Sequence, residues 1–142
     1  MERSRGAVIF RKEGIKILYL LLHYESGHWD FVKGHVEKGE NDEETVKREA
    51  KEETGLDIEI LPSFKERITY FYRNEGKTIS KEVVFYAAKA EIGDVKLSHE
   101  HKGFKWLLFE DALKHITFDN SKTILKNAHK FISKQNLKDF MK

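Results

Sequence analysis

Residues 34–56 read GHVEKGENDEETVKREAKEETGL, and this stretch says more about the chain than any other. Five residues separate Gly34 from Glu40, and seven more separate Glu40 from Arg48. After that arginine, acidic, apolar and glycine residues follow at fixed positions: Glu49, Ala50, Glu52, Glu53, Gly55 and Leu56. A solvated charged segment has no reason to combine both spacings with these residue types, so the stretch is a motif.

The motif contains a predicted helix over residues 41–54. Asn41 or Asp42 is suited to cap its start, and Gly55 stands where a helix C-cap is expected. Two glutamates follow the cap, where acids interact favourably with the positive end of the helix dipole. Two glycines bracket the preceding loop, and small residues let the backbone approach a ligand closely.

Three glutamates of this helix are candidate metal ligands. Glu49, Glu52 and Glu53 stand at positions i, i+3 and i+4, so their carboxylates share one face. Like charges at this spacing destabilise a helix unless a cation neutralises them. Mg²⁺ or Mn²⁺ is suited to that role, because hard cations take oxygen ligands and keep waters free for substrate phosphates. Arg48 is adjacent and can steer a neighbouring carboxylate. A merely solvated acidic face is the alternative interpretation.

The composition restricts the class of protein. Its 142 residues fit a single domain, 1–142, and 39% hydrophobic with 35% charged residues is typical of a globular chain. The absence of cysteine excludes a disulfide framework, a thiolate zinc site and a thiol nucleophile. A net charge of +2 is too small to indicate nucleic-acid binding. Without a membrane-length apolar run or a signal-peptide layout, a cytoplasmic location is expected.

Hydrophobic patterning predicts a mixed β-sheet covered by helices on both faces, an α/β architecture. Turns are expected at Glu13-Gly14 and at residues 74–77. The predicted strands are 4–11, 15–23, 29–32, 57–73 (interrupted at Pro62), 79–91 and 103–109. Two further helices are predicted near 109–115 and 121–134.

The motif resembles the Nudix box, and the rest of the chain resembles the asymmetric diadenosine tetraphosphate hydrolases of that family. The likeness covers residues 6–131. It rests further on Lys33-Gly34-His35, at the start of the box, and outside the box on the stretch Leu97-Ser98-His99-Glu100-His101 and on Trp106-Leu107. It implies the Nudix fold, an α/β/α sandwich, and Mg²⁺-dependent attack of water on one phosphorus of a dinucleoside polyphosphate.

The resemblance also implies roles for individual residues. Gly34 (through its carbonyl), Glu49, Glu52, Glu53 and Glu100 would hold the cation. Either Glu49 or Glu100 would act as the general base, since a carboxylate near metal stays ionised. Lys33, His35 and Lys81 would contact phosphates, Tyr70 would donate its hydroxyl to a phosphate, and Phe118 would stack on adenine. The alternative for these last five is that the cations and imidazole are surface groups and the aromatics are core.

Two positions depart from the family pattern. Val32 stands where the family usually has proline, and the hairpin between Tyr70 and Lys81 looks longer than in animal members. His99 and His101 flank Glu100, but other nitrogen or sulfur ligands at zinc spacing do not accompany them. We therefore expect these two histidines to be structural.

Other functions share the same box. A nucleoside triphosphate pyrophosphatase or a 5′-end RNA pyrophosphohydrolase would use it equally, although the weak net charge argues against an RNA substrate. A nucleotide sensor that binds without cleaving would be expected to lack one or more box glutamates. We expect a small-molecule substrate, no nucleic-acid or membrane partner, and a monomer or weak dimer.

Overall fold

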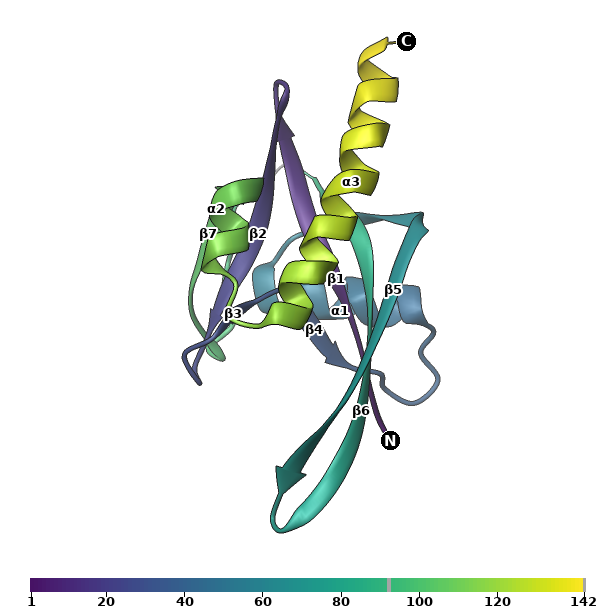
Figure 1. Ribbon diagram of the computed structural model, residues 1–142, viewed down its shortest axis with the longest axis vertical. Coiled ribbons are helices and arrows are strands. Elements are labelled where there is room, and N and C mark those ends of the chain that lie inside the picture. Colours follow the sequence, from purple (N-terminus) through teal and green to yellow (C-terminus); the bar gives the residue numbers. More distant parts are fainter. Residues whose placement is uncertain (92, 142) are drawn as a thin grey trace.

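The computed structural model describes residues 1–91 and 93–141 (Figure 1). Its elements, in chain order, are β1 Glu2–Glu13, β2 Lys16–Tyr24, β3 Trp29–Asp30, β4 Val32–His35, α1 Asp42–Thr54, β5 Ile58–Asn74, β6 Lys77–Ala90, β7 His101–Leu108, α2 Phe109–His115 and α3 Asp119–Met141. None of the helices within the described ranges combines the length and apolarity that crossing a membrane requires.

The sheet is mixed and centres on β1. That strand runs parallel to β6 and antiparallel to β2 and β4. The main path is β3-β2-β1-β6-β5, with β7 paired to β2. Strands β3 and β4 were predicted as one piece, and they are separate because the chain changes partner at Phe31, from β2 to β1.

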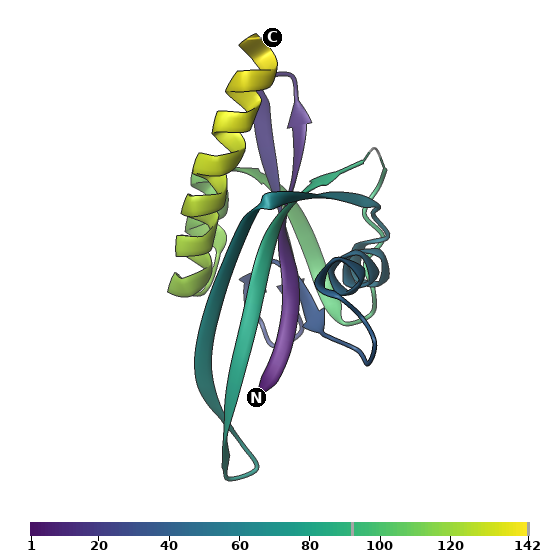
Figure 2. The same ribbon diagram turned by 90° about the vertical axis from the view of Figure 1, so that its right-hand side faces the viewer.

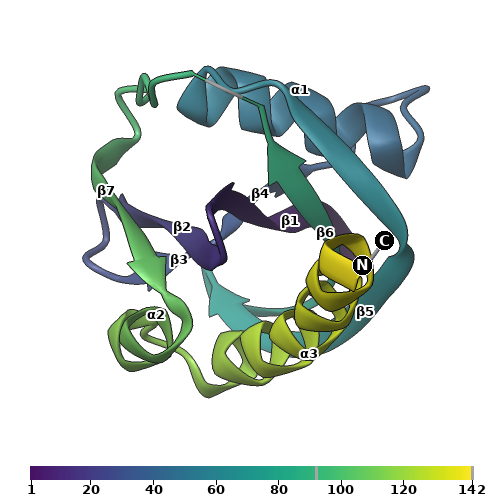
Figure 3. The same ribbon diagram turned by 90° about the horizontal axis from the view of Figure 1, so that it is seen from above.

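Helices cover both faces of the sheet, as Figures 2 and 3 show. One core lies between the sheet and α2 and α3, where Ile124, Leu125 and Ala128 meet strand residues such as Phe85. The second core lies under α1, where Val46 and Ala50 pack on the opposite face. Two buried faces require two layers of helix, so the predicted α/β/α sandwich is confirmed.

Helix α1 is capped at both ends by residues of the motif. The Asn41 side chain accepts a hydrogen bond from the Glu44 N–H at 2.8 Å, and the Glu44 carboxylate accepts one from the Asn41 N–H at 3.1 Å. This reciprocal pair is a capping box. Gly55 ends the helix with φ at 74°, a left-handed conformation that favours glycine. Both predicted caps are confirmed, with Asn41 and not Asp42 at the start.

The β5–β6 hairpin is long and extends away from the body of the protein (Figure 1). Glu75 and Gly76 form its turn with φ at 51° and 76°. Tyr70 stands directly opposite Lys81 in the ladder. The register shifts between Leu61 and Lys65, at the bulge that contains proline and absorbs its missing N–H.

Asp42 links the first turn of α1 to the sheet. Its carboxylate accepts a hydrogen bond from Tyr86 and pairs with Arg5 Nε at 2.8 Å. Burial raises the pKa of Asp42, but the bonds from Tyr86 and Arg5 outweigh burial and leave that pKa below its usual value of 3.8. A carboxyl with a lowered pKa stabilises the fold above pH 3.8 and loses this contribution as the pH falls further.

We therefore expect Asp42→Asn to lower the free energy of unfolding by roughly 1 kcal/mol at pH 7 and by less at pH 3. Urea denaturation at the two pH values measures the difference. Asp57→Asn is the control, because that carboxylate is 71% exposed. A loss of the same size at both pH values in Asp42→Asn would contradict the claim that the ionised carboxylate of Asp42 stabilises the fold.

Candidate active site

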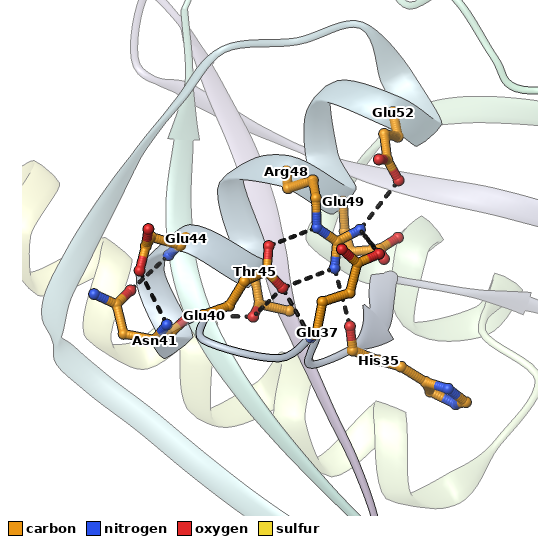
Figure 4. Close-up of polar contacts among 9 residues, drawn as sticks. All are labelled: His35, Glu37, Glu40, Asn41, Glu44, Thr45, Arg48, Glu49 and Glu52. Atoms are coloured by element: carbon orange, nitrogen blue, oxygen red, sulfur yellow. Dashed lines mark hydrogen bonds and ion pairs between the residues drawn. The ribbon is translucent and has the colours of Figure 1, made fainter.

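Arg48 organises the carboxylates around the motif loop (Figure 4). Its Nε and Nη2 atoms donate to the two oxygens of Glu40 at 2.7 and 3.0 Å, a bidentate ion pair. Its Nη1 donates to Glu49 at 2.8 Å and to Glu52 at 3.1 Å, and Nη2 also donates to the His35 carbonyl at 3.0 Å. Arg48 thus fixes the loop to the helix and orients two of the candidate ligands.

Glu40 is the anchor of this arginine. Besides Arg48, its Oε1 accepts hydrogen bonds from the Glu37 N–H at 2.9 Å and the Thr45 hydroxyl at 3.0 Å. The bond from Arg48 and those from the backbone and Thr45 lower the pKa of Glu40 to about 2. The sequence placed Glu40 at a fixed position in the motif but gave it no role, and its role here is to hold Arg48.

Gly34 lies against the carboxylate of Glu49. A Cβ placed on Gly34 would lie 2.0 Å from Glu49 Cδ and 2.2 Å from its Oε1. Only a glycine leaves room for the carboxylate at this point of β4. The backbone of the loop and the helix glutamate therefore come together, as the motif suggested.

Glu53 is the buried member of the set. Its side chain is 6% exposed, and its Oε2 lacks a hydrogen-bond partner within the described parts of the chain. Burial, with the charge of Glu49, raises the pKa of Glu53 to about 7, although His101 opposes this. Burial also raises the pKa of Glu49, although Arg48 opposes this.

These features fit a divalent cation. Buried carboxylates with raised pKa values and an unpartnered oxygen are stabilised in their ionised form by a positive ion. Among residues 1–91 and 93–141, no group of three acidic or histidine side chains is already arranged around one point. The side chain of Glu52 is 59% exposed and is directed to Arg48 instead. Its rotation would bring a third carboxylate to those of Glu49 and Glu53.

Glu100 reaches the same region from the loop before β7. The Tyr24 hydroxyl donates to the Phe31 carbonyl at 2.5 Å. Burial raises its pKa, and the negative charges of Glu53, Asp30, Glu49 and Glu100 raise it further. The Ser98 N–H donates to the Glu53 carbonyl at 3.1 Å, so the loop that carries Glu100 lies beside α1, and Glu100 itself is exposed.

The residues expected to bind phosphate lie on the other face of the sheet. A Cβ on Gly6 would lie 2.8 Å from Lys33 Cβ and 3.0 Å from Phe85, which belongs to the core under α2 and α3. Side chains two residues apart on a strand point the same way. That face therefore also carries His35, Lys81, which stands two residues before Val83 of this core, and Tyr70, which is partly buried and packs against the core as its alternative interpretation expected.

Two of these residues interact electrostatically. Burial lowers the pKa of Lys81, and the charge of Lys33 lowers it further while Glu2 opposes this. Lys33 lies 3.5 Å from the buried carboxylate of Asp30, and His35, 66% exposed, lies 3.8 Å from Glu2. The two lysines thus lie on one face of the sheet, and the charge of Lys33 acts on Lys81.

Phe118 lies in the connection between α2 and α3, 47% exposed. Its ring centroid is 5.2 Å from that of His28, which stacks on Tyr24 at 4.5 Å with the planes 10° apart. The backbone of Thr117 donates to the Trp29 carbonyl at 3.2 Å, which fixes this connection to β3. Phe118 is not a core residue, so the packing alternative for it is wrong.

A cavity of about 430 Å³ opens beside the motif loop. Three basic side chains line it, those of Arg3, His35 and Lys38. The other lining residues are Met1, Val36 and Glu37. Arg3 gave no signal in the sequence because β1 reads simply as a strand.

Sequence reasoning did not foresee the contact made by His101. We expected this histidine to be structural, and its imidazole is fully buried 3.2 Å from Glu53. The available signal was its position next to Glu100, but only the fold shows that β7 brings it to α1. Its neighbour His99 is exposed, as expected for a residue with no contact to the site.

Comparisons with known proteins show what the chain is similar to. Residues 1–127 match the NUDIX domain. The chain is 35% identical to the asymmetrical bis(5′-nucleosyl)-tetraphosphatase of Rattus norvegicus over 92% of its own length and 95% of that protein, and 37% identical to that of Caenorhabditis elegans over 92% and 96%. A crystal structure of a C. elegans Ap4A hydrolase binary complex superposes with a TM-score of 0.83 at 34% identity, covering 94% of this chain and 98% of that one.

The domain match spans most of the chain, and the relatives share its fold and nearly its full length. The motif loop, the capped helix and the arginine-centred carboxylates lie within the matched residues. This chain therefore belongs to the Nudix family of hydrolases.

Proposed function

We propose that this protein hydrolyses dinucleoside polyphosphates asymmetrically, with diadenosine tetraphosphate giving ATP and AMP. The observation that carries the proposal is the near full-length similarity to asymmetrical tetraphosphatases from rat and C. elegans. Its acidic site on α1 and its lysines on the opposite sheet face suit a substrate with a long anionic bridge.

The cation site of the proposed enzyme consists of the Gly34 carbonyl with Glu49, Glu52 and Glu53 from α1, and Glu100 from the loop before β7. Mg²⁺, with Mn²⁺ as a substitute, would supply charge neutralisation and an activated water when bound. Arg48 orients Glu49, and Glu52 is free to turn because it is 59% exposed. Glu49 or Glu100 would accept the proton of the attacking water.

The bridge of the substrate would pass around β4. Gly34 on this strand faces Glu49 of α1, whereas Lys33 is on the face under α2 and α3. Among the described strands β4 pairs only with β1, so its other side is not covered by a strand. Lys33 and Lys81 would neutralise phosphates, which also relieves the repulsion between the two lysines.

The remaining contacts concern the ends of the substrate. His35 and the Tyr70 hydroxyl would reach phosphates, and the half-exposed ring of Phe118 would stack on adenine. We further propose that the enzyme acts in the cytoplasm as a monomer or weak dimer, without a nucleic-acid or membrane partner.

Product analysis in oxygen-18 water tests the function. We expect diadenosine tetraphosphate with Mg²⁺ to give ATP and AMP, with the label in one product only. We expect EDTA to abolish turnover and added Mg²⁺ to restore it, because the buried glutamates need a cation. Two ADP molecules would contradict asymmetric cleavage. Faster turnover of nucleoside triphosphates or 5′-triphosphate RNA would assign another Nudix activity, and binding without turnover would identify a sensor.

A further inference from the structure

His101, the first residue of β7, makes a buried contact with the acidic site. Its side chain is 0% exposed, and its Nε2 lies 3.2 Å from Oε1 of Glu53, itself 6% exposed. A carboxylate oxygen can only accept, so this contact is favourable with the imidazole proton on Nε2, although Nε2 makes no hydrogen bond of good geometry among the described residues.

The other ring nitrogen connects His101 to the loop that carries Glu100. Nδ1 lies 3.1 Å from the hydroxyl oxygen of Ser98, so the serine hydroxyl donates to it. The same serine oxygen accepts a hydrogen bond from the Glu100 N–H at 3.4 Å. Tyr24 packs against the imidazole edge-on, with ring centroids 4.6 Å apart, and fixes the plane of the ring.

Backbone contacts attach the same loop to the end of α1. The Lys96 N–H donates to the Thr54 carbonyl at 2.7 Å, and the Ser98 N–H donates to the Glu53 carbonyl at 3.1 Å. The carboxylate of Glu53 and its own backbone are thus both held by residues of one loop. A change in this loop would displace Glu53 and Glu100 together.

We propose that His101 is a positioning residue for the cation site. It holds Oε1 of Glu53 and leaves the unpartnered Oε2 free to coordinate, and through Ser98 it keeps Glu100 in register with α1. This inference rests on the cation site of the proposed function. Residues that contact the ligands of a metal from outside set ligand orientation, and their loss typically reduces metal affinity about 10–100-fold.

The test measures Mn²⁺ binding without substrate, by titration calorimetry, in two variants of the same residue. His101→Phe keeps a ring in the buried space but has no N–H, and we expect its Mn²⁺ affinity to fall about 10–100-fold. His101→Gln retains a donor that can reach Glu53, and we expect it to recover most of that loss. In turnover at saturating metal, kcat of His101→Phe should fall with KM changed less than about twofold.

His99→Phe is the matched control, because His99 is on the same loop and exposed; we expect wild-type Mn²⁺ affinity. Equal Mn²⁺ affinity in His101→Phe and wild type would overturn the positioning role while leaving the proposed function intact. A wild-type protein that binds no Mn²⁺ would overturn the cation site itself. Should His101→Phe not fold, Ser98→Ala removes only the Nδ1 partner, and unchanged affinity there overturns the proposal.

Discussion

Glu53→Gln is expected to reduce kcat for diadenosine tetraphosphate by about 10³-fold, the factor that corresponds to several kcal/mol of lost transition-state stabilisation. Glu53 is the buried carboxylate of the site, and its Oε2 has no hydrogen-bond partner in the described parts of the chain. The amide retains the shape of the side chain but removes the charge that a cation requires. Steady-state kinetics with Mg²⁺ measures the effect.

Stability should change in the opposite direction. Burial raises the pKa of Glu53 to about 7, so ionising it costs free energy in the metal-free protein. We therefore expect Glu53→Gln to have an equal or higher Tm in EDTA at pH 8. Glu43→Gln is the matched control on the same helix, because Glu43 is 62% exposed and pairs with Lys47. A variant at position 53 with more than a tenth of wild-type kcat would refute the assignment of Glu53 as a metal ligand.

Gly34→Ala is expected to lower kcat about 10²-fold while leaving the fold intact, since displacing a catalytic group by about 1 Å has effects of this size. The added Cβ would lie 2.0 Å from Glu49 Cδ, a distance that non-bonded atoms cannot adopt. The far end of the flexible Glu49 side chain gives way more readily than the backbone of β4. Glu49 would then leave the position that Arg48 and Gly34 define.

Gly103→Ala provides the comparison for this prediction. Gly103 also lies on a strand, β7, but a Cβ there would have no atom within 4 Å. We expect wild-type kcat and Tm for it, and a wild-type Tm with reduced kcat for Gly34→Ala. If Gly34→Ala lost stability and activity together, the effect would be one of folding and not of Glu49 position. Wild-type kcat in Gly34→Ala would show that Glu49 position is not critical.

The helix α1 and its ends were predictable because the signals are local. Asn41, Glu44 and Gly55 satisfy backbone groups within one turn, and the spacing of Glu49 and Glu53 places them on one helix face. The turns at Gly14 and at Glu75-Gly76 were also predictable, because short turns require positive φ values and glycine adopts these readily. Strand pairing was not, since parallel β1 and β6 are joined by more than sixty residues that say nothing about register.

Two features of the site depend on non-local contacts. Lys33 and Gly34 are neighbours in the sequence, and successive residues of a strand point to opposite faces of the sheet. Lys33 is therefore on the face under α2 and α3, whereas Gly34 faces Glu49 of α1. The sequence likewise separates His101 from Glu53 by the whole β5–β6 hairpin, and the fold brings β7 and α1 together so that the two side chains lie 3.2 Å apart.

The amino-acid sequence was enough to predict the candidate groups of the site: the motif carboxylates, the arginine beside them and the capped helix that spaces them. Helix periodicity explains why the glutamates of α1 share one face. The environment of these groups depends on the folded protein, in which Glu53 is buried, Glu40 holds Arg48, and His101 faces a carboxylate. Burial and pairing arise from packing between distant segments, and that packing determines which of several similar glutamates becomes the one with a raised pKa.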